Sequence, residues 1–177
     1  EPGIVYEGAG FAIRSFWLRH SKPCMGYTME ETPRPGIFYT KKAEEYGVPR
    51  GPLWSKLQQG EDVNIGEGIT VSSENVMGPP RKGRKFSYIT DTVYLDSIPG
   101  KVRDSDLFIC EGMFTDELKE SAKEKKHLTS IQAASLAKEA DVHKLGLIHY
   151  SPRYTEYELR QLLKEAKGIF PNTFLTR

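Results

Sequence analysis

The sequence has few cysteines, no long apolar run and almost no excess of one charge. Its two cysteines, Cys24 and Cys110, lie far apart, which excludes a disulfide framework and a cysteine zinc knuckle. No apolar run approaches the length of a membrane span, and no secretory signal pattern is visible. These absences are typical of a reducing cytosol, and we expect a soluble, cytoplasmic protein.

The charges that are present nearly cancel. Lys and Arg number 25 and Asp and Glu number 24, which gives a formal net charge of +1. The bulk charge therefore does not predict a nucleic-acid-binding protein, and any attraction for phosphate must come from local clusters. The length of 177 residues fits one domain and is sufficient to bury a hydrophobic core.

Residues 4–31 and 84–177 have the pattern of alternating strands and helices, which predicts an α/β fold. Thr129 or Ser130 is a candidate cap for a helix with an apolar face. A second helix is predicted over Tyr157–Ala166, closed by Gly168 at its C′ position. Strands are predicted at Phe11–Leu18, Lys85–Ile89, Leu107–Cys110 and Leu145–Ile148.

The segment between them, residues 33–84, is rich in Pro and Gly, which favours short elements over long ones. Lys41–Tyr46 and Leu53–Gln58 each fit a short helix. Between Pro33 and Lys85 the sequence has nine Lys and Arg against six Asp and Glu, a local charge of +3. We interpret this segment as an arm inserted into the α/β body.

Four apolar runs each lead into an ionisable residue, namely His20, Asp91, Glu111 and His149. In layered α/β folds the carboxyl ends of strands open onto the ligand crevice, so these side chains are expected to converge. Imidazole and carboxylate are ligands that Zn²⁺ prefers, and an Asp can bridge two ions. His127 precedes the helix that is predicted to begin near Ser130, and we expect its imidazole to be able to face the same crevice.

Each of these residues alone has a simpler interpretation. A single His after a strand is usually a structural or solvated residue, Asp91-Thr92 fits a turn, and Glu111 fits a surface carboxylate. His143 has no matching context and is interpreted as a surface residue. From the pattern alone, a metal site and a set of unrelated structural residues both remain open.

Several short motifs follow one another in a fixed order along the chain. They are His20 with Gly26-Tyr27, Gly51-Pro52, Asp91-Thr92, Cys110 to Phe114, His127 to Thr129, His149 to Tyr154 and Ile169 to Thr173. Together they resemble the second half of ribonuclease Z, of the metallo-β-lactamase superfamily, over essentially all 177 residues. The resemblance implies half of an αββα sandwich, with residues 33–84 as an inserted flexible arm that binds tRNA.

The resemblance also implies a role for each ionisable residue. His20 would bind one metal ion, Asp91 would bridge two and His149 would bind the second, with zinc as the expected metal. His127 would donate a proton to the leaving 3′-oxygen, and Glu111 would hold it in orientation. Two ions would polarise the scissile phosphate and activate a water. The implied reaction is removal of the 3′ trailer from precursor tRNA by an endoribonuclease. The resemblance also implies that the protein forms a homodimer.

RNA contacts are implied at two places. Arg153 would lie near the scissile phosphate, although a structural role beneath Tyr154 remains open. The arm would contact the RNA backbone through its basic residues and its Gly-Pro pair. The arm residues in question are Arg50, Gly51, Pro52 and Lys56.

The family's His-x-His-x-Asp-His string does not occur in this sequence. Each ion would therefore keep two protein ligands, fewer than the three of a catalytic zinc site. We expect the chain alone to be inactive or nearly so, and to act within a longer polypeptide or with a partner. The alternative is a non-catalytic RNA-binding or dimerisation fragment, favoured by Thr90, Gly112 and Leu128, which replace the family's usual residues. The long arm disfavours a metallo-hydrolase for a small substrate, since such a ligand needs no remote grip.

Overall fold

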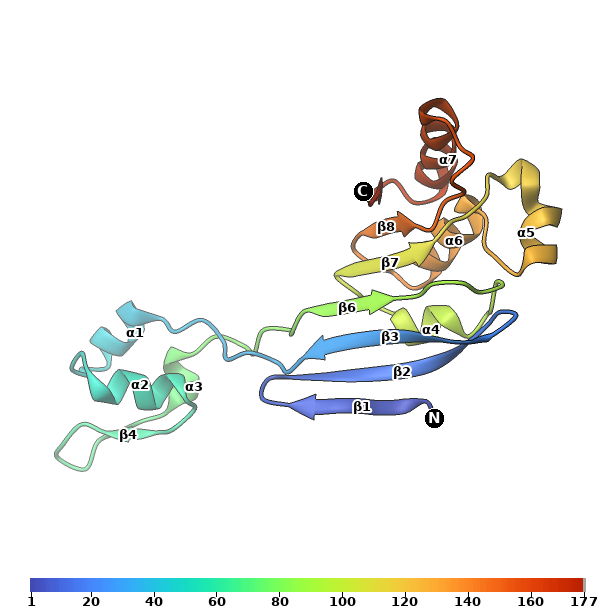
Figure 1. Ribbon diagram of the computed structural model, residues 1–177. Coiled ribbons are helices and arrows are strands. Elements are labelled where there is room, and N and C mark those ends of the chain that lie inside the picture. The colour runs from blue at the N-terminus through green and yellow to red at the C-terminus, as the bar shows by residue number, and fades with distance from the viewer. Residues whose placement is uncertain (177) are drawn as a thin grey trace. The chain divides into compact units, whose positions relative to one another are not determined.

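The computed structural model describes residues 1–176 and divides the chain into two compact units (Figure 1). The larger unit, here called the body, comprises Glu1–Glu31 and the described residues from Arg84 onward. The smaller unit, here called the inserted unit, is Thr32–Gly83. No helix within residues 1–176 is long and apolar enough to cross a membrane.

The body is built on a seven-stranded sheet with the order β1-β2-β3-β6-β7-β8-β9. The first four strands pair antiparallel, and β6 to β9 pair parallel, with a helix between each parallel strand and the next. This arrangement confirms the predicted α/β fold. The strands are β1 Gly3–Gly8, β2 Phe11–Arg19, β3 Pro23–Glu31, β6 Lys85–Tyr88, β7 Leu107–Glu111, β8 Leu145–Ile148 and β9 Thr173–Leu175.

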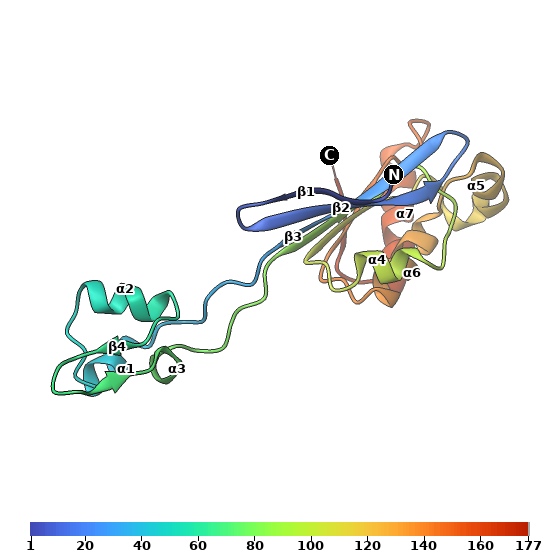
Figure 2. The same ribbon diagram turned by 90° about the horizontal axis from the view of Figure 1, so that it is seen from below.

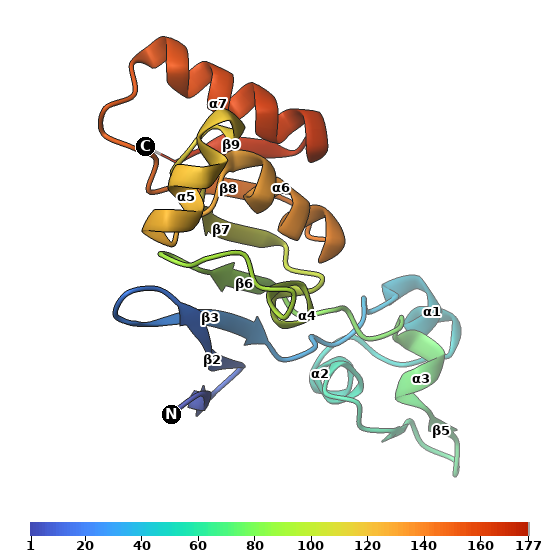
Figure 3. The same ribbon diagram turned by 90° about the vertical axis from the view of Figure 1, so that its right-hand side faces the viewer.

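Helices cover one face of this sheet. The helices of the body are α4 Ile98–Val102, the 3-10 turn η1 Asp116–Leu118, α5 Lys119–Lys125, α6 Ser130–Glu139 and α7 Glu156–Ile169. Figure 2 shows α4 and α6 on the same side of the strands, and Figure 3 shows α6 and α7 side by side next to β8 and β9. Apolar side chains of these three helices form one buried core with Phe16, Phe108 and Leu147 of the strands.

The opposite face of the sheet is apolar and partly open to solvent. Directly paired residues of neighbouring strands share a face, and Trp17 pairs with Met25 while Tyr27 pairs with Tyr88. Trp17 is 52% exposed and Tyr27 is 41% exposed. Large aromatic side chains at this exposure mark a surface suited to packing against another element. An open apolar face is what half of an αββα sandwich is expected to present.

The predicted start of one helix agrees with the structure, whereas the predicted end of another does not. Thr129 caps α6 in a capping box with Gln132, which confirms the first of the two predicted caps. Gly168, however, lies inside α7 and does not end it, so the predicted C′ position is wrong. The helix continues because Ile169 and Phe170 pack against the core of the body.

The inserted unit has a small core of its own. Two short helices occur where the pattern predicted them, and Ala43, Leu57 and Val76 are fully buried among their neighbours. Within Thr32–Gly83 there are seven Lys and Arg and six Asp and Glu, so the unit itself is nearly neutral. Its elements are α1 Thr40–Glu45, α2 Pro52–Gln58, β4 Val63–Asn64, β5 Thr70–Val71 and α3 Ser73–Val76.

Candidate functional site

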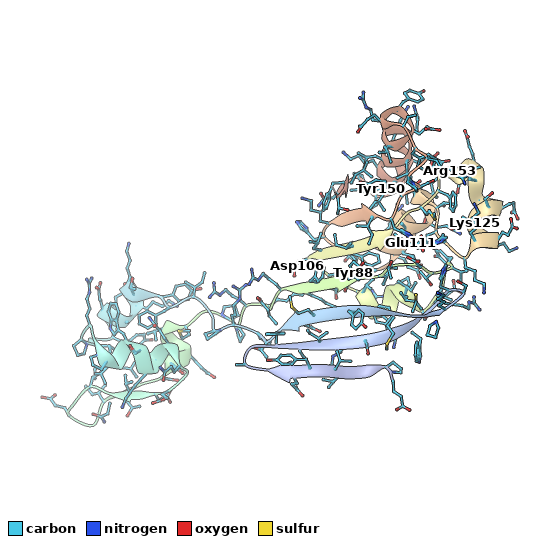
Figure 4. All side chains as sticks on the ribbon, viewed as in Figure 1. Tyr88, Asp106, Glu111, Lys125, Tyr150 and Arg153 are labelled. Carbon is cyan, nitrogen blue, oxygen red and sulfur yellow. The ribbon has the colours of Figure 1, made fainter. Side chains whose placement is uncertain are left out.

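The predicted site residues lie where strands of the body end. His20 directly follows β2, Glu111 is the last residue of β7, and His149 directly follows β8. Asp91 lies in the loop after β6. Because β2 and β6 both run antiparallel to β3, and β6 to β8 run parallel, all four carboxyl ends meet at one edge. Figure 4 shows Glu111 at this end of β7.

Asp91 is the centre of the cluster. Its Oδ1 lies 3.1 Å from Nδ1 of His149, and its Oδ2 lies 3.8 Å from Nε2 of His20. The His20 ring is held from its other side, because its Nδ1–H donates to the carbonyl of Lys126 over 3.0 Å. Nε2 is therefore the ring nitrogen of His20 that faces Asp91. The structure thus brings together three residues that are far apart in the sequence.

A neighbouring hydroxyl orients the Asp91 carboxylate. Thr90 donates its Oγ1–H to Oδ1 of Asp91 over 2.7 Å. Burial acts to raise the pKa of Asp91, but this hydrogen bond and the adjacent His149 outweigh it, so the pKa is lowered. The sequence showed Thr90 only as a departure from the family, and its contact with the next side chain was missed.

His149 has an unusual backbone conformation. Its φ is 55°, in the left-handed region that few residues other than glycine adopt. Such a conformation costs free energy and persists where the surrounding structure holds it, which is frequent at functional sites. The turn ends β8 abruptly and directs the imidazole to Asp91.

Glu111 and His127 form a buried pair. Nδ1 of His127 lies 3.1 Å from Oε2 of Glu111 and 3.2 Å from Oε1. The backbone N–H of Thr92 also donates to Oε1, over 2.6 Å. Burial raises the pKa of Glu111 to about 8, against the opposing effect of the backbone N–H groups of Thr92 and Leu128. Burial also lowers the pKa of His127.

The pKa shifts of Glu111 and His127 indicate which nitrogen of the His127 ring carries a hydrogen. At neutral pH the Glu111 carboxyl keeps its proton and donates it to Nδ1 of His127, or transfers it to form an ion pair. In both arrangements Nε2 of His127 carries a hydrogen. The pair is therefore able to donate a proton from Nε2 to an oxygen atom.

The loop that carries His127 is fastened to α7. Glu165 accepts a hydrogen bond from the backbone N–H of Asp116 over 3.0 Å and one from the hydroxyl of Ser130 over 2.7 Å. Asp116 and Ser130 lie on either side of His127 in the chain, so one carboxylate holds both ends of the loop. Sequence reasoning missed Glu165, because a contact between residues 35 positions apart leaves no local pattern.

The donor set fits a metal ion that takes nitrogen and oxygen ligands. His20, Asp91 and His127 offer ligand atoms within 4.8 Å of one another, and so do Glu111, His127 and His149. Imidazole and carboxylate are the usual ligands of zinc outside cysteine sites. Geometry alone admits His127 as a ligand, because it belongs to both groups, although its Nδ1 faces Glu111 and leaves Nε2 as its one available nitrogen.

The predicted RNA contact in the body, Arg153, is exposed in the loop after β8. Figure 4 shows it at the same end of the body as Glu111. The hydroxyl of the neighbouring Tyr154 accepts a hydrogen bond from the backbone N–H of Thr115 over 2.9 Å. The Arg153 side chain is thus exposed to solvent, whereas its neighbour is built into the loop.

The other predicted RNA contacts lie around the start of α2 in the inserted unit. Gly51 has a φ of 135°, which favours glycine, and Pro52 is the first residue of the helix. Lys56 is exposed on the same helix. Arg50 is also exposed, but its Nε donates to Glu44 over 3.0 Å, so its charge is already paired.

Comparison with known proteins identifies the relatives of this chain. A β-lactamase superfamily domain model matches residues 54–150. Ribonuclease Z of Treponema denticola is 56% identical over 177 residues, which is 100% of this chain and 58% of that protein. Ribonuclease Z of Methanosarcina acetivorans is 46% identical over 175 residues, which is 99% of this chain and 57% of that protein. The chain thus spans little more than half the length of these curated relatives.

Solved structures show the same fold. Human tRNase Z, short form, superposes with a TM-score of 0.58 at 19% identity, over 99% of this chain and 44% of that one. The metallo-β-lactamase fold protein YhfI of Bacillus subtilis gives a TM-score of 0.58 at 19% identity, over 99% of this chain and 48% of that one. The predicted metallo-β-lactamase fold and the resemblance to ribonuclease Z are both confirmed.

Proposed function

The chain belongs to the β-lactamase superfamily, and on that premise we propose that it forms part of a metal-dependent endoribonuclease that removes the 3′ trailer from precursor tRNA. The convergence of His20 and His149 on Asp91, beside the Glu111–His127 pair, is the observation that carries the proposal. The sequence identity to proteins named ribonuclease Z supports this choice of reaction within the superfamily.

In this proposal His20, Asp91 and His149 hold the metal, with zinc as the expected ion and two ions in the complete enzyme. Bound ions of this kind polarise a phosphodiester and lower the pKa of a bound water. Asp91 suits a bridging position, because its two oxygens face two different imidazoles. Its lowered pKa favours the ionised form that a metal ligand requires.

His127 is the proposed general acid. Breaking the phosphodiester expels the 3′-oxygen of the RNA, and an unprotonated alkoxide is a poor leaving group at neutral pH. The Nε2 of His127 carries the hydrogen that the leaving oxygen needs. Glu111 is a positioning residue, because it contacts Nδ1 and fixes which nitrogen faces the substrate.

We further propose that the chain supplies only part of the site. Asp91 with one imidazole on each side gives two protein ligands per ion, below the number that a catalytic zinc site uses. The remaining ligands would come from a longer polypeptide or from a partner. The open apolar face of the sheet, with Trp17 and Tyr27 exposed, supports a missing element that packs there.

The inserted unit is proposed to grip precursor tRNA away from the scissile bond. The exposed Lys56 and the turn at Gly51-Pro52 support a contact with the RNA backbone. A homodimer and a cytoplasmic location are proposed from the resemblance to ribonuclease Z.

The test is cleavage of a labelled precursor tRNA by the natural polypeptide that contains this chain. The expected products are a tRNA that ends in a 3′-hydroxyl and a trailer that begins with a 5′-phosphate. EDTA should abolish the cleavage and added zinc should restore it. Failure to release the trailer in the zinc-loaded protein would contradict the proposed reaction.

A second measurement tests the proposed incompleteness. Zinc titrated into the 177-residue chain by calorimetry should show weak binding. A tight stoichiometry of two ions per chain would show that the ligands are already complete, and the partial-site proposal would be wrong.

A further inference from the structure

A basic groove lies beside His127 in the body. Lys119 and Lys123, one turn apart on α5, line it together with Lys126, which follows the helix. Arg19, at the end of β2, lines the same groove. Residues from two separate elements therefore bring positive charge to one concave surface that His127 also lines.

The backbone on both sides of the groove is tied to the site. The carbonyl of Lys126 accepts the hydrogen bond from His20 Nδ1. The backbone N–H of Arg19 donates to Oγ1 of Thr92 over 3.1 Å, and the N–H of Thr92 donates to Glu111. The charged residues are therefore attached, through their own main chain, to the groups that surround Asp91.

The charge of the groove differs from that of the chain as a whole. Four cationic side chains line it with one carboxylate, Glu120, whereas the whole chain has a net charge of only +1. The three lysines are exposed, so they are free to meet a polyanion. Val93 and Tyr94 add an apolar and aromatic surface to the same groove. A row of cations beside an aromatic ring suits a nucleic-acid strand better than one small anion.

We propose that this groove binds the phosphodiester backbone of the RNA on the 5′ side of the scissile bond, at the 3′ end of the mature tRNA. The assignment of the side rests on the proposed function, in which His127 protonates the leaving 3′-oxygen. That oxygen belongs to the nucleotide 5′ of the break. In this proposal the strand that occupies the groove beside His127 is the one that ends in this oxygen.

The first experiment measures RNA binding by the natural polypeptide that contains this chain. A short fluorescein-labelled single-stranded RNA is titrated at several salt concentrations, with Lys123→Ala and Lys125→Ala compared. Both variants remove one positive charge from α5, but Lys125 lies outside the groove, over the Phe114 ring. Figure 4 marks Lys125 on this helix.

Lys123→Ala should reduce the slope of log K against log salt by about 0.7, the value for one lost contact with a single strand. Lys125→Ala should leave the slope unchanged. Equal slopes for both variants, or for Lys123→Ala and the wild type, would overturn the proposal. Lys119→Ala provides a repeat of the test at a second position of the groove.

The second experiment identifies the side of the scissile bond. Precursor tRNAs with a long trailer and with a single-nucleotide trailer are compared as substrates. Lys123→Ala should raise KM about fivefold for both, since about 1 kcal/mol of binding is lost on the tRNA side. An increase that appears only with the long trailer would place the trailer in the groove and overturn the proposal. If the wild type cleaves no precursor tRNA, the proposed function fails, and the salt slopes alone then decide whether the groove binds RNA.

Discussion

The two carboxylates of the site, Asp91 and Glu111, lie at the same end of the sheet strands. Their pKa values are nevertheless shifted in opposite directions. Asp91 is partly exposed, between His20 and His149, and its pKa is lowered. Glu111 is fully buried against His127, and burial raises its pKa to about 8. Pairs of titratable groups whose environments move their pKa values apart identify which group holds charge and which holds a proton. These opposite shifts support the proposal that the Asp91 side binds metal and that the Glu111 side transfers a proton.

The largest effect is expected from Asp91→Asn in the natural polypeptide. The amide keeps the shape of the side chain but removes the negative charge that faces both imidazoles. Bound zinc, measured by elemental analysis, and trailer cleavage should both be lost. Full zinc content in this variant would contradict the proposed role of Asp91, because the metal would then depend on other ligands.

The variant His127→Ala tests the proposed proton transfer by the Glu111–His127 pair. Removing a general acid lowers turnover by about 10²–10⁴-fold. Zinc content and the affinity for precursor tRNA should remain close to those of the wild type. A parallel loss of zinc would show that His127 is a ligand, which the geometry of the histidine cluster also admits.

Replacing Thr32–Gly83 by a short Gly-Ser linker should affect neither the proposed metal binding nor the proposed proton transfer. KM for precursor tRNA should rise about tenfold or more, equivalent to at least about 1.4 kcal/mol of binding. Hydrolysis of a small phosphodiester should be retained, since the inserted unit has its own core. If both activities fall together, the unit stabilises the body and is not only a grip on RNA.

The last prediction concerns the pH dependence of stability in the metal-free protein. The pKa of Glu111 is raised from 4.5 to about 8, so its contribution is present at low pH and is lost as pH rises to about 8. His127, with a pKa lowered from 6.5, acts in the opposite sense, and only below pH 6.5.

Between pH 6.5 and about 8 the Glu111 effect therefore acts alone, and the free energy of unfolding should fall by at most about 2 kcal/mol. Glu111→Gln should remove this fall, as measured by urea denaturation in EDTA at the two ends of the window. An unchanged pH dependence in the variant would show that Glu111 is not the group that titrates.

Much of the placement of the candidate site residues followed from the sequence, because strand patterns are local. Apolar runs that end in His20 and His149 place those residues directly after β2 and β8. The capping motif at Thr129 was visible for the same reason. Whether the ends of distant strands meet depends on sheet order, which local patterns do not contain.

The contacts that orient the site were not predictable from such patterns. The bond from His20 to the Lys126 carbonyl joins residues 106 positions apart, and Glu165 reaches its loop from a different helix. The local charge of +3 between Pro33 and Lys85 includes Arg84 and Lys85, which both belong to the body, so the inserted unit itself has a net charge of only +1. Four cationic side chains gather instead around the groove beside His127, and they come from two elements that are distant in the sequence.

The most direct test is a crystal structure of the zinc-loaded natural polypeptide, with anomalous scattering measured at the zinc edge. We predict one peak between His20 Nε2 and Asp91, a second between Asp91 and His149, and no bond from either ion to His127. A zinc ion bonded to Nε2 of His127, or no zinc at Asp91, would contradict the division of the site into a metal side and a proton side.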